Sequence, residues 1–348
     1  MRIVVPAFGA VETLPRCIEA LTQSEGVRTS DIYVVDDGDN GDVKQTLARF
    51  RVNSMLTGGA HSAGGARNHG AAGYQGDVLV FVDADVEVER SAIDLLVAPI
   101  LAKQTQATVG NYSNDTTRLG FYQAYKQLYL SRIYSRRKSF IRNHFWTALC
   151  AIDATSFFAL GGFAGEIIGA CEEDTEFGQR MTRANIQILS VPEAMGRHIK
   201  PYDFKSLVLN DFRKGMSTVP LFLRKDVNIT DNRHASRVDI IAVGCAGILL
   251  ALIPFLLISP LARSPILLIV PLLYLTVRID LLAYFRKPGF RFLVCAIPLM
   301  YLLDVVRGIC VARGLLGCAA YHVRKGLQRC HRRALASPVA GTGRQHDI

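Results

Sequence analysis

The stretch Val78–Val88, VLVFVDADVEV, decides the fold class. It begins with a run of apolar residues rich in Val, which is typical of a central parallel strand buried on both faces. The run ends at Asp83 and Asp85, so two carboxylates directly follow the strand. In open α/β sheets, ligands bind outside the carboxyl ends of the strands. The stretch therefore predicts a ligand site at this edge of a sheet.

Asp83 and Asp85 form an Asp-x-Asp motif, which suits a divalent cation shared with phosphate groups. Mg²⁺ and Mn²⁺ prefer carboxylate oxygen, and such ions usually keep positions for water and substrate phosphate. The alternative is a solvated turn with two acidic residues, because an Asp-x-Asp pair alone often occurs by chance. The surrounding chain has to decide between the two.

Strands and helices alternate before this motif. Apolar runs at 2–6, 32–35 and 52–56 predict strands, and apolar residues recur at helical spacing between residues 14 and 21. The second of these strands ends in Asp36 and Asp37, again at the carboxyl end. Such alternation predicts βαβ units, and therefore an α/β fold with a mostly parallel sheet.

A glycine-rich stretch, GGAHSAGGARNHGAAG, occupies residues 58–73. It contains neither the Gly-Lys-Ser/Thr of a phosphate loop nor the G-x-G-x-x-G spacing of a dinucleotide fold. It does place Arg67 at the start of a helix, where a guanidinium group suits a phosphate or a base edge. An ordinary glycine loop with one surface arginine is the alternative.

The motif is followed by a predicted helix at 91–103 and predicted strands at 107–112 and 146–152. Residues 118–142 form an aromatic helical pattern that ends in a basic cluster, which indicates either a helix on an anionic membrane surface or one packed on the domain with its charges in water. A further helix is predicted at 157–163. Residues 171–180, CEEDTEFGQR, are acidic first and basic last, the order that a helix dipole favours.

From about residue 239 onward the chain is mostly apolar. Residues 240–260 and 264–285 have the length that a bilayer requires and predict two transmembrane helices. A third apolar region, 292–321, contains Asp304, Arg307 and Arg313, which are costly in hydrocarbon unless they pair, face a cavity or reach the interface. This region is either a third span or an interfacial helix.

The chain has 40 Lys and Arg against 30 Asp and Glu, a net charge of +10. Many of these cations lie between the apolar segments or after the last one, where membrane proteins carry their cytoplasmic charges. We therefore predict no nucleic-acid partner, and a multi-pass protein of the cell inner membrane with a cytoplasmic head. The N-terminal residues MRIVVPAFGA lack the features of a signal peptide.

Five pieces of the first 220 residues occur in the order of a known family. They are IVVPAFG at 3–9, VVDDG at 34–38, GGARNHG at 64–70, VFVDADV at 80–86, and GGF at 161–163 followed by EEDTEFGQR at 172–180. Together they resemble glycosyltransferase family 2, the inverting nucleotide-sugar transferases of the GT-A fold. The resemblance implies a GT-A catalytic head that uses Mg²⁺ or Mn²⁺.

The resemblance implies a role for each matching position. The expected nucleotide-sugar-binding residues are Pro6, Asp36, Asp37, Arg67, Asp83, Asp85 and Glu173. The expected metal ligands are Asp85, which is favoured as the direct ligand, together with Asp83 and His198. Asp174 aligns with the catalytic base, and Arg180, Arg213 and Lys214 are candidate contacts to a phosphate or the acceptor.

The implied reaction needs a carboxylate that takes the proton of an acceptor hydroxyl as its oxygen attacks the anomeric carbon. Processive members of the family carry Gln-x-x-Arg-Trp after the base. The corresponding region here reads NDFRKGMS, at residues 210–217, and Trp146 is the only tryptophan. We therefore expect a single sugar to be added.

These observations predict a GT-A domain at 1–225, a linker at 226–238, a membrane domain at 239–321 and a basic, disordered tail at 322–348. The expected donor is a nucleotide sugar, with UDP favoured over GDP, and the expected acceptor is a lipid-linked or envelope glycan precursor. Two alternatives stay open, namely transfer to a polyprenyl phosphate and a catalytically inactive module that only binds the sugar nucleotide at the membrane.

Overall fold

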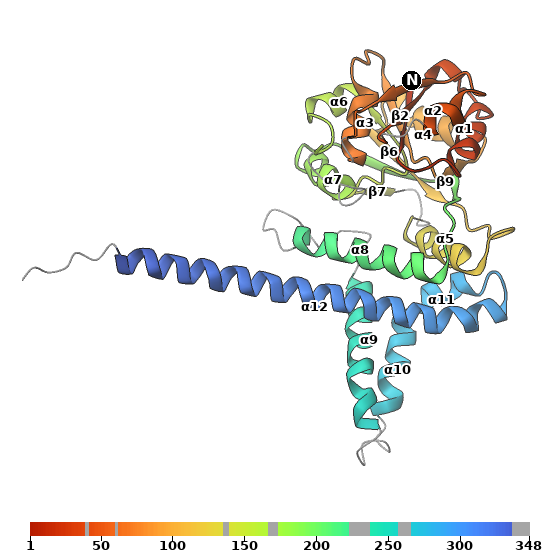
Figure 1. The fold of residues 1–348 in the computed structure, drawn as a ribbon. Helices are drawn as coiled ribbons and strands as arrows, with labels where there is room; N and C mark the ends of the chain where they lie inside the picture. Colours follow the sequence, from red (N-terminus) through yellow and green to blue (C-terminus); the bar gives the residue numbers. More distant parts are fainter. Residues whose placement is uncertain are drawn as a thin grey trace, which may run out of the picture.

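A computed structural model of the chain describes residues 1–38, 42–59, 62–134, 139–165, 173–222, 237–256 and 266–335. An α/β head lies above two long helices, α8 and α12, and a pair of helices, α9 and α10, projects from these away from the head (Figure 1). The head is built on one nine-stranded sheet, in the order β3-β2-β1-β4-β8-β6-β9-β5 with β7 beside β9.

The first half of the sheet is parallel. It consists of β1 (Arg2–Ala7), β2 (Ile32–Asp36), β3 (Asn53–Leu56) and β4 (Val78–Val82). All residues of β4 are buried, which confirms the sequence prediction for this strand. Helices α1 (Leu14–Thr22), α2 (Asp42–Leu47) and α3 (Ala63–Ala71) connect these strands. The carboxyl ends of β1, β2 and β4 therefore meet at one edge.

Part of the glycine-rich stretch has a packing role. A Cβ atom at Gly70 would lie 2.4 Å from Cγ1 of Val4 and 2.8 Å from Cγ2 of Val35. Glycine thus allows α3 to lie closely on β1 and β2, because a side chain at this position would collide with the sheet. This contact fixes the helix on which Arg67 lies.

The second half of the sheet mixes directions. Strand β8 (Leu149–Asp153) runs antiparallel between β4 and β6 (Ala107–Tyr112), and β9 (Ile188–His198) pairs parallel with β6. The short strands β5 (Val86–Val88) and β7 (Ser139–Ile141) pair antiparallel with β9. Because β5 pairs with the end of β9, the Asp-x-Asp turn lies beside His198.

Most helices of the head occur where the sequence predicts them. Helix α4 is Ala92–Leu101 and α7 is Glu173–Arg183. Helix α6, Ala154–Ala159, begins three residues before the predicted 157–163. The reason is an N-cap: the backbone N–H of Ser156 donates to Oδ2 of Asp153 at 2.8 Å, which starts the helix directly after β8.

Helix α5 (Phe121–Tyr134) differs in one respect from the prediction of a helix packed on the domain with its charges in water. It packs on the domain, and Tyr125 is almost completely buried. Its charges, however, are not all in water, because Lys126 is buried, the side chain of Arg132 is 8% exposed, and both are paired with carboxylates of the C-terminal half. The basic residues at 135–138 lie outside the described part of the chain.

The C-terminal half consists of α8 (Phe204–Phe222), α9 (Arg237–Leu256), α10 (Ile266–Val277), α11 (Ile279–Phe285) and α12 (Phe290–Leu335). Residues 226–236, most of the predicted linker at 226–238, lie outside the described part of the chain. Helix α12 continues to Leu335, past residue 322 where the tail was predicted to begin.

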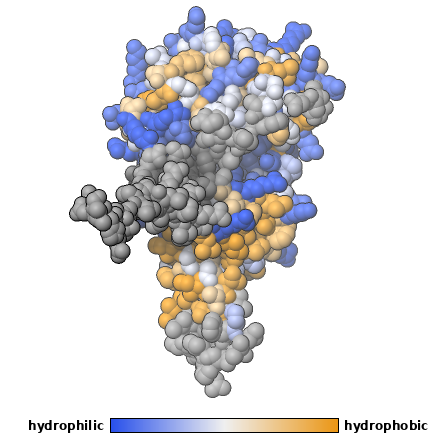
Figure 2. Space-filling view, turned by 60° about the vertical axis from the view of Figure 1, so that its left-hand side comes forward, coloured by the Kyte–Doolittle hydropathy of each residue, from blue (hydrophilic) through white to orange (hydrophobic). Residues whose placement is uncertain are grey.

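Within the described residues, one helical stretch, Phe290–Leu316 of α12, is long and apolar enough to cross a membrane by length and composition. The two predicted spans, 240–260 and 264–285, are described only in part, since residues 257–265 are not included. Figure 2 shows hydrophobic side chains gathered over the C-terminal helices, below a head on which hydrophilic and hydrophobic residues are mixed. Exposed apolar residues there include Ile241, Ile248, Leu272 and Val294.

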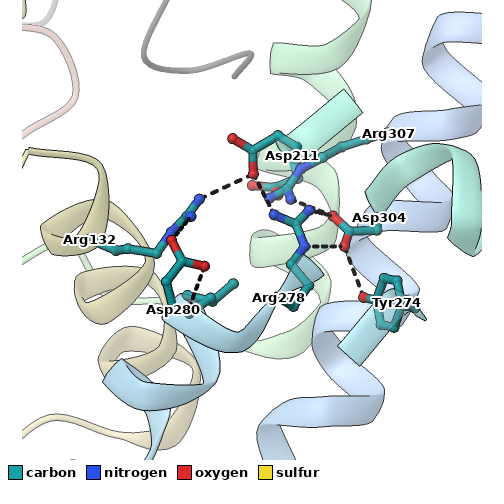
Figure 3. Close-up of polar contacts among 9 residues, drawn as sticks. Arg132, Asp211, Tyr274, Arg278, Asp280, Asp304 and Arg307 are labelled. Atoms are coloured by element: carbon teal, nitrogen blue, oxygen red, sulfur yellow. Dashed lines mark hydrogen bonds and ion pairs between the residues drawn. The ribbon is translucent and has the colours of Figure 1, made fainter. Parts of the chain in front are cut away.

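A cluster of charged residues joins the head to these helices (Figure 3). We call it the junction cluster, and it consists of Lys126, Arg132, Asp211, Asp239, Tyr274, Arg278, Asp280, Asp304 and Arg307. At its centre, Nε and Nη2 of Arg278 donate to the two carboxylate oxygens of Asp304 at 3.0 and 2.7 Å. Both side chains are fully buried. Nη1 of Arg278 also bonds Asp239.

The junction cluster extends from this centre to both sides. Nη1 of Arg307 donates to Asp304 at 2.8 Å, and Arg307 also bonds Asp211. Asp211 in turn accepts from Nζ of Lys126 at 2.7 Å. The sequence required Asp304 and Arg307 to pair, face a cavity or reach the interface, and pairing is the solution that the structure adopts.

Candidate active site

The carboxyl edge of the parallel strands carries the first group of predicted site residues. The backbone N–H of Asp37 donates to the carbonyl of Ala7 at 2.9 Å, so the loops after β1 and β2 are held together next to Pro6. The Asp37 carboxylate bonds the Thr57 hydroxyl and accepts from the backbone N–H of Ser62 at 2.8 Å. Asp37 therefore ties the β2 loop to the start of α3.

Asp36 is 2% exposed at the end of β2. Its Oδ1 accepts from the backbone N–H of Gly38 at 2.9 Å, whereas Oδ2 is buried and has no hydrogen-bond partner among the described residues. A buried carboxylate oxygen without a partner is costly, and such atoms are rare in native proteins, where a ligand, an ion or a water molecule can complete the pairing. This oxygen is a candidate hydrogen-bond acceptor for the base or ribose of a bound nucleotide sugar.

Arg67 connects two separate parts of the site. Its guanidinium group donates to Oδ1 of Asp83 at 2.6 Å and to Oε1 of Glu173 at 2.9 Å. The Arg67 side chain is 3% exposed. Burial alone would lower the pKa of Arg67, but the charges of Asp83 and Glu173 outweigh it and raise this pKa. The arginine is therefore a fixed cation that joins α3, the Asp-x-Asp turn and α7.

Glu173 has one oxygen on Arg67, while its other oxygen, Oε2, is buried without a partner in the described part of the chain. Burial raises the pKa of Glu173, with a further contribution from Asp174 and an opposing one from Arg67. The site thus contains a carboxylate that is only partly compensated, at the N-terminus of α7.

Asp85 and His198 face each other across the turn between β4 and β5. Oδ2 of Asp85 lies 3.6 Å from Nε2 of His198. Burial and the nearby charge of Lys214 lower the pKa of His198 to about 3, so its imidazole is neutral near pH 7. Burial raises the pKa of Asp85, against the effects of Lys200 and Lys214. A neutral imidazole next to a carboxylate is a suitable donor set for a cation.

Among the described residues, no group of three or more His, Cys, Asp or Glu side chains is arranged to hold a metal ion. The structure brings Asp85 and His198 together, whereas Asp83 faces Arg67. Two protein donors still fit Mg²⁺ or Mn²⁺, because these ions are often bound by one or two side chains plus substrate phosphates. The metal set predicted from the sequence stays a prediction.

The remaining predicted contacts, Arg180, Arg213 and Lys214, lie on two different helices. Lys214 and Arg213 are exposed on α8, and the charge of Lys214 acts on both Asp85 and His198. Arg180 forms a two-point ion pair with Glu176 at 2.7 Å and donates to the carbonyls of Leu160 and Gly162. Arg180 thus holds the turn after α6, and its role toward a substrate stays a prediction.

Sequence reasoning missed one residue next to the predicted base. His144 is fully buried, and its Nε2 lies 3.7 Å from Oδ2 of Asp174. The Asp174 side chain is 21% exposed, so an acceptor can reach it. No motif marks His144, but Gly178 is a signal that was available. Glycine inside a helix is unfavourable, and it often indicates close approach of another segment.

Comparison with known proteins agrees with this geometry. Residues 2–161 match the sequence model of glycosyl transferase family 2. "Glycosyltransferase GlyA" of Streptococcus pneumoniae serotype 4 (strain ATCC BAA-334 / TIGR4) is 24% identical over 139 residues, which are 38% of this chain and 20% of that protein. The chain thus matches about a fifth of the length of this relative.

Among solved structures, the mannosyltransferase PcManGT from Pyrobaculum calidifontis, in complex with GDP-Man and Mn²⁺, superposes with a TM-score of 0.58 at 13% identity. The match covers 89% of this chain and 86% of that one, so it includes C-terminal helices as well as the head. The fold is that of the GT-A glycosyltransferases. Residues 2–161, a little under half of the chain, thus resemble glycosyl transferase family 2.

Proposed function

We propose that the chain transfers a single sugar, with inversion, from a nucleotide-sugar donor to a hydroxyl group of a lipid-linked or envelope glycan precursor. The observation that carries this proposal is the bridge by Arg67 between Asp83 and Glu173. This bridge brings the Asp-x-Asp turn next to the N-terminus of α7. Asp174, which directly follows Glu173, is then in range of a donor held at that turn.

In this proposal, donor binding uses the carboxyl edge of the sheet. Asp36 and Asp37 contact the base and ribose, since Asp36 has an acceptor oxygen without a partner in the described part of the chain. Arg67 and Asp83 orient the ribose and diphosphate. Asp85 and His198 would hold Mg²⁺ or Mn²⁺, which when bound supplies positive charge that stabilises the leaving diphosphate.

Asp174 acts as the general base. Its carboxylate accepts the proton of the acceptor hydroxyl while that oxygen forms a bond to the anomeric carbon. The bond from this carbon to the diphosphate oxygen breaks on the opposite side, and the electron pair leaves with the nucleotide diphosphate. Attack and departure in line invert the anomeric configuration, and no covalent enzyme intermediate is needed.

We further propose that α9 and α10 anchor the enzyme in the cell inner membrane, with the head in the cytoplasm. Figure 1 shows these helices side by side, pointing away from the head and across the direction of α8 and α12. Exposed apolar side chains on α9, α10 and the first part of α12 support a lipid environment. A shared surface raises the frequency with which the head meets a lipid acceptor.

One observation favours a second candidate acceptor, a polyprenyl phosphate. Lys200 and Lys214 are exposed, and their charges act on both Asp85 and His198. Cations beside a diphosphate site suit an additional phosphate group. In that case the attacking oxygen belongs to the phosphate, which needs no strong base. Loss of Asp174 would then have a small effect on the rate.

The test uses membranes containing the full chain, incubated with labelled UDP- and GDP-sugars with and without a chelator. We expect a labelled lipid product that is lost with chelator and restored by Mn²⁺ or Mg²⁺. Asp174→Asn should lower kcat by about 10²–10⁴-fold while donor binding persists, because a general base contributes about that factor. Mass analysis of the product distinguishes a sugar phosphate from a glycoside.

Each alternative has its own signature in this experiment. Full activity of Asp174→Asn with a phosphate-linked product would support the polyprenyl phosphate acceptor. Donor binding without turnover for every sugar nucleotide would instead support an inactive binding module. Glu176→Gln is a matched control, because it removes a carboxylate two residues further along α7 that is paired with Arg180.

A further inference from the structure

The segment Asn143–Phe145 is fixed along α7, the helix that carries Asp174. The backbone N–H of Asn143 donates to the Thr182 hydroxyl at 2.9 Å, and the backbone N–H of Phe145 donates to the carbonyl of Asp174 at 3.1 Å. Asn143 has a φ of 60°, a conformation that Asn tolerates better than most residues. The segment is therefore bound to α7 on both sides of His144.

Gly178 permits this close approach. A Cβ atom at position 178 would lie 2.5 Å from both the backbone N and the Cα of His144. These are main-chain atoms, which cannot rotate away as a side chain can. Any larger residue at position 178 must therefore push the segment off the helix. The chain uses an unfavourable helix residue at the one place where His144 crosses α7.

The His144 ring lies between two consecutive residues at the start of α7. Its Nδ1 is 3.3 Å from the hydroxyl of Thr175, and its Nε2 is 3.7 Å from Oδ2 of Asp174. An ionised carboxylate only accepts hydrogen bonds, so the nitrogen facing it carries the proton. In a neutral ring, Nδ1 is then the acceptor and Thr175 the donor. The carboxylate of Asp174 thus sets the tautomer of the ring, and the Thr175 hydroxyl supports the ring from its other nitrogen.

The two adjacent carboxylates of α7 consequently have different partners. Glu173 is held by Arg67 on the donor side, and Asp174 faces His144. A separation of 3.7 Å is longer than a hydrogen bond, but such contacts in a free enzyme often shorten when the substrate binds. A displacement of a catalytic group by about 1 Å can lower the rate about 10²-fold.

We propose that His144 is a positioning residue for Asp174, held in place by Thr175 and by the close contact at Gly178. The proposal rests on the proposed function, in which Asp174 is the base. His144 then acts on the chemical step through Asp174 and has no contact with the nucleotide. Its loss should lower kcat and leave the donor KM nearly unchanged.

The experiment measures kcat and donor KM for the full chain in detergent or membranes. His144→Phe should lower kcat about 10²-fold with the donor KM within about threefold of the wild type, by the cost of a misplaced catalytic group. His144→Gln retains an N–H donor at a similar distance and should recover most of this loss. His69→Gln, at an exposed position on α3, controls for the loss of an imidazole.

A double-mutant cycle separates positioning from a general structural role. If His144 acts only through the base, His144→Phe should cause no further loss of kcat in the Asp174→Asn background. Thr175→Val should lower kcat and Thr175→Ser should not, because serine keeps the hydroxyl. Gly178→Ala should mimic His144→Phe, although it changes no ionisable group.

These outcomes distinguish the two proposals. A wild-type kcat for His144→Phe, in an enzyme that Asp174→Asn inactivates, would overturn the role of His144 and leave the proposed function intact. Full activity of Asp174→Asn would overturn the base assignment itself. If His144→Phe does not fold, His144→Gln and the Thr175 pair decide, and equal kcat for Thr175→Val and Thr175→Ser counts against the proposal.

Discussion

The molecule contains two largely buried charge clusters that differ in their balance of charge. The first lies at the carboxyl edge of the sheet, where the nucleotide-sugar donor is proposed to bind, and we call this the donor edge. There Arg67 is shared between Asp83 and Glu173, and both Nε of Arg67 and Oε2 of Glu173 lack a partner among the described residues. In the junction cluster, four cationic and four anionic side chains interlock (Figure 3).

The difference indicates what each cluster contributes. A buried ion pair seldom adds much stability over apolar packing, but removal of one partner leaves a charge that is costly to bury. The junction cluster has balanced charge, so it fixes α5 and α8 relative to the C-terminal helices. The donor cluster, which consists of Arg67, Asp83 and Glu173, has an excess negative charge, and two of its polar atoms lack a partner among the described residues. Departures of this kind are expected at functional sites, where a ligand completes the pairing.

The largest expected effect comes from breaking the junction cluster at its centre. Arg278→Met removes the fork that binds Asp304 and also a partner of Asp239. We expect the free energy of unfolding to fall by about 3–5 kcal/mol, because the buried carboxylate of Asp304 keeps only Arg307 as a cationic partner and the cluster is left with an excess negative charge. Thermal and denaturant unfolding of the full chain in detergent, followed by the fluorescence of Trp146, measures this change.

Two variants serve as controls for this prediction. Arg291→Met removes an exposed arginine of α12 and should change the unfolding free energy by less than about 0.5 kcal/mol. Arg278→Met combined with Asp304→Leu removes both members of the central pair and should recover a large part of the loss. Equal destabilisation by Arg278→Met and Arg291→Met would mean that the cluster has no structural role.

Replacement of one charged residue at the donor edge should have the opposite effect, with little change in stability and a clear change in donor binding. Glu173→Gln keeps an oxygen for Arg67 and removes a carboxylate whose burial is already unfavourable, as its raised pKa indicates. We expect the unfolding free energy to change by no more than about 1 kcal/mol, because a neutral amide is less costly to bury. The donor KM should rise about tenfold through the weaker hold on Arg67.

Calorimetric titration with nucleotide diphosphate, alongside unfolding of the same preparation, tests both parts. A loss of stability as large as that of Arg278→Met, with unchanged donor binding, would contradict the distinction between the two clusters. Glu176→Gln is again a suitable control, since its carboxylate is on the same helix but is paired with Arg180.

The sequence predicts the donor edge better than the junction cluster. Strands β1, β2 and β4 are continuous apolar runs that end in acidic residues, and the carboxyl ends of parallel strands share an edge. The local sequence pattern is therefore enough to predict that Asp36 and Asp83 lie at the same edge of the sheet. Asp85 and His198 meet because β5 pairs with β9, a contact that no local periodicity encodes.

The pairing in the junction cluster could not be predicted from sequence patterns. Arg132 and Asp239 are 107 positions apart, and Lys126 and Asp211 are 85 positions apart. The charges of α5 resemble those of any solvated helix face, so the sequence placed them in water. Only the arrangement of α8, α9 and α12 around α5 shows that they are buried. The contact of His144 with α7 was not predicted for the same reason, because its partners on α7 are not close to it in the sequence.

The smallest expected effect concerns the pH dependence of the junction cluster. Asp211 is on α8, beside the head, between Lys126 and Arg307. Burial tends to raise its pKa, but the two cations outweigh burial and hold this pKa well below its ordinary value. A carboxyl whose pKa is depressed by folding stabilises the native state above its unfolded pKa of about 3.9. This contribution is lost as the pH falls further toward the folded pKa.

We therefore expect Asp211→Asn to be less stable than the wild type at pH 6, and the difference between them to shrink as the pH is lowered from about 5 to 3. One proton limits the change to about 1.4 kcal/mol per pH unit. Unfolding of both proteins across this range measures it, and Asp77→Asn controls for the loss of one surface carboxylate. A difference that stays constant with pH would show that Asp211 contributes packing only, because linkage requires a pH-dependent term whenever folding shifts a pKa.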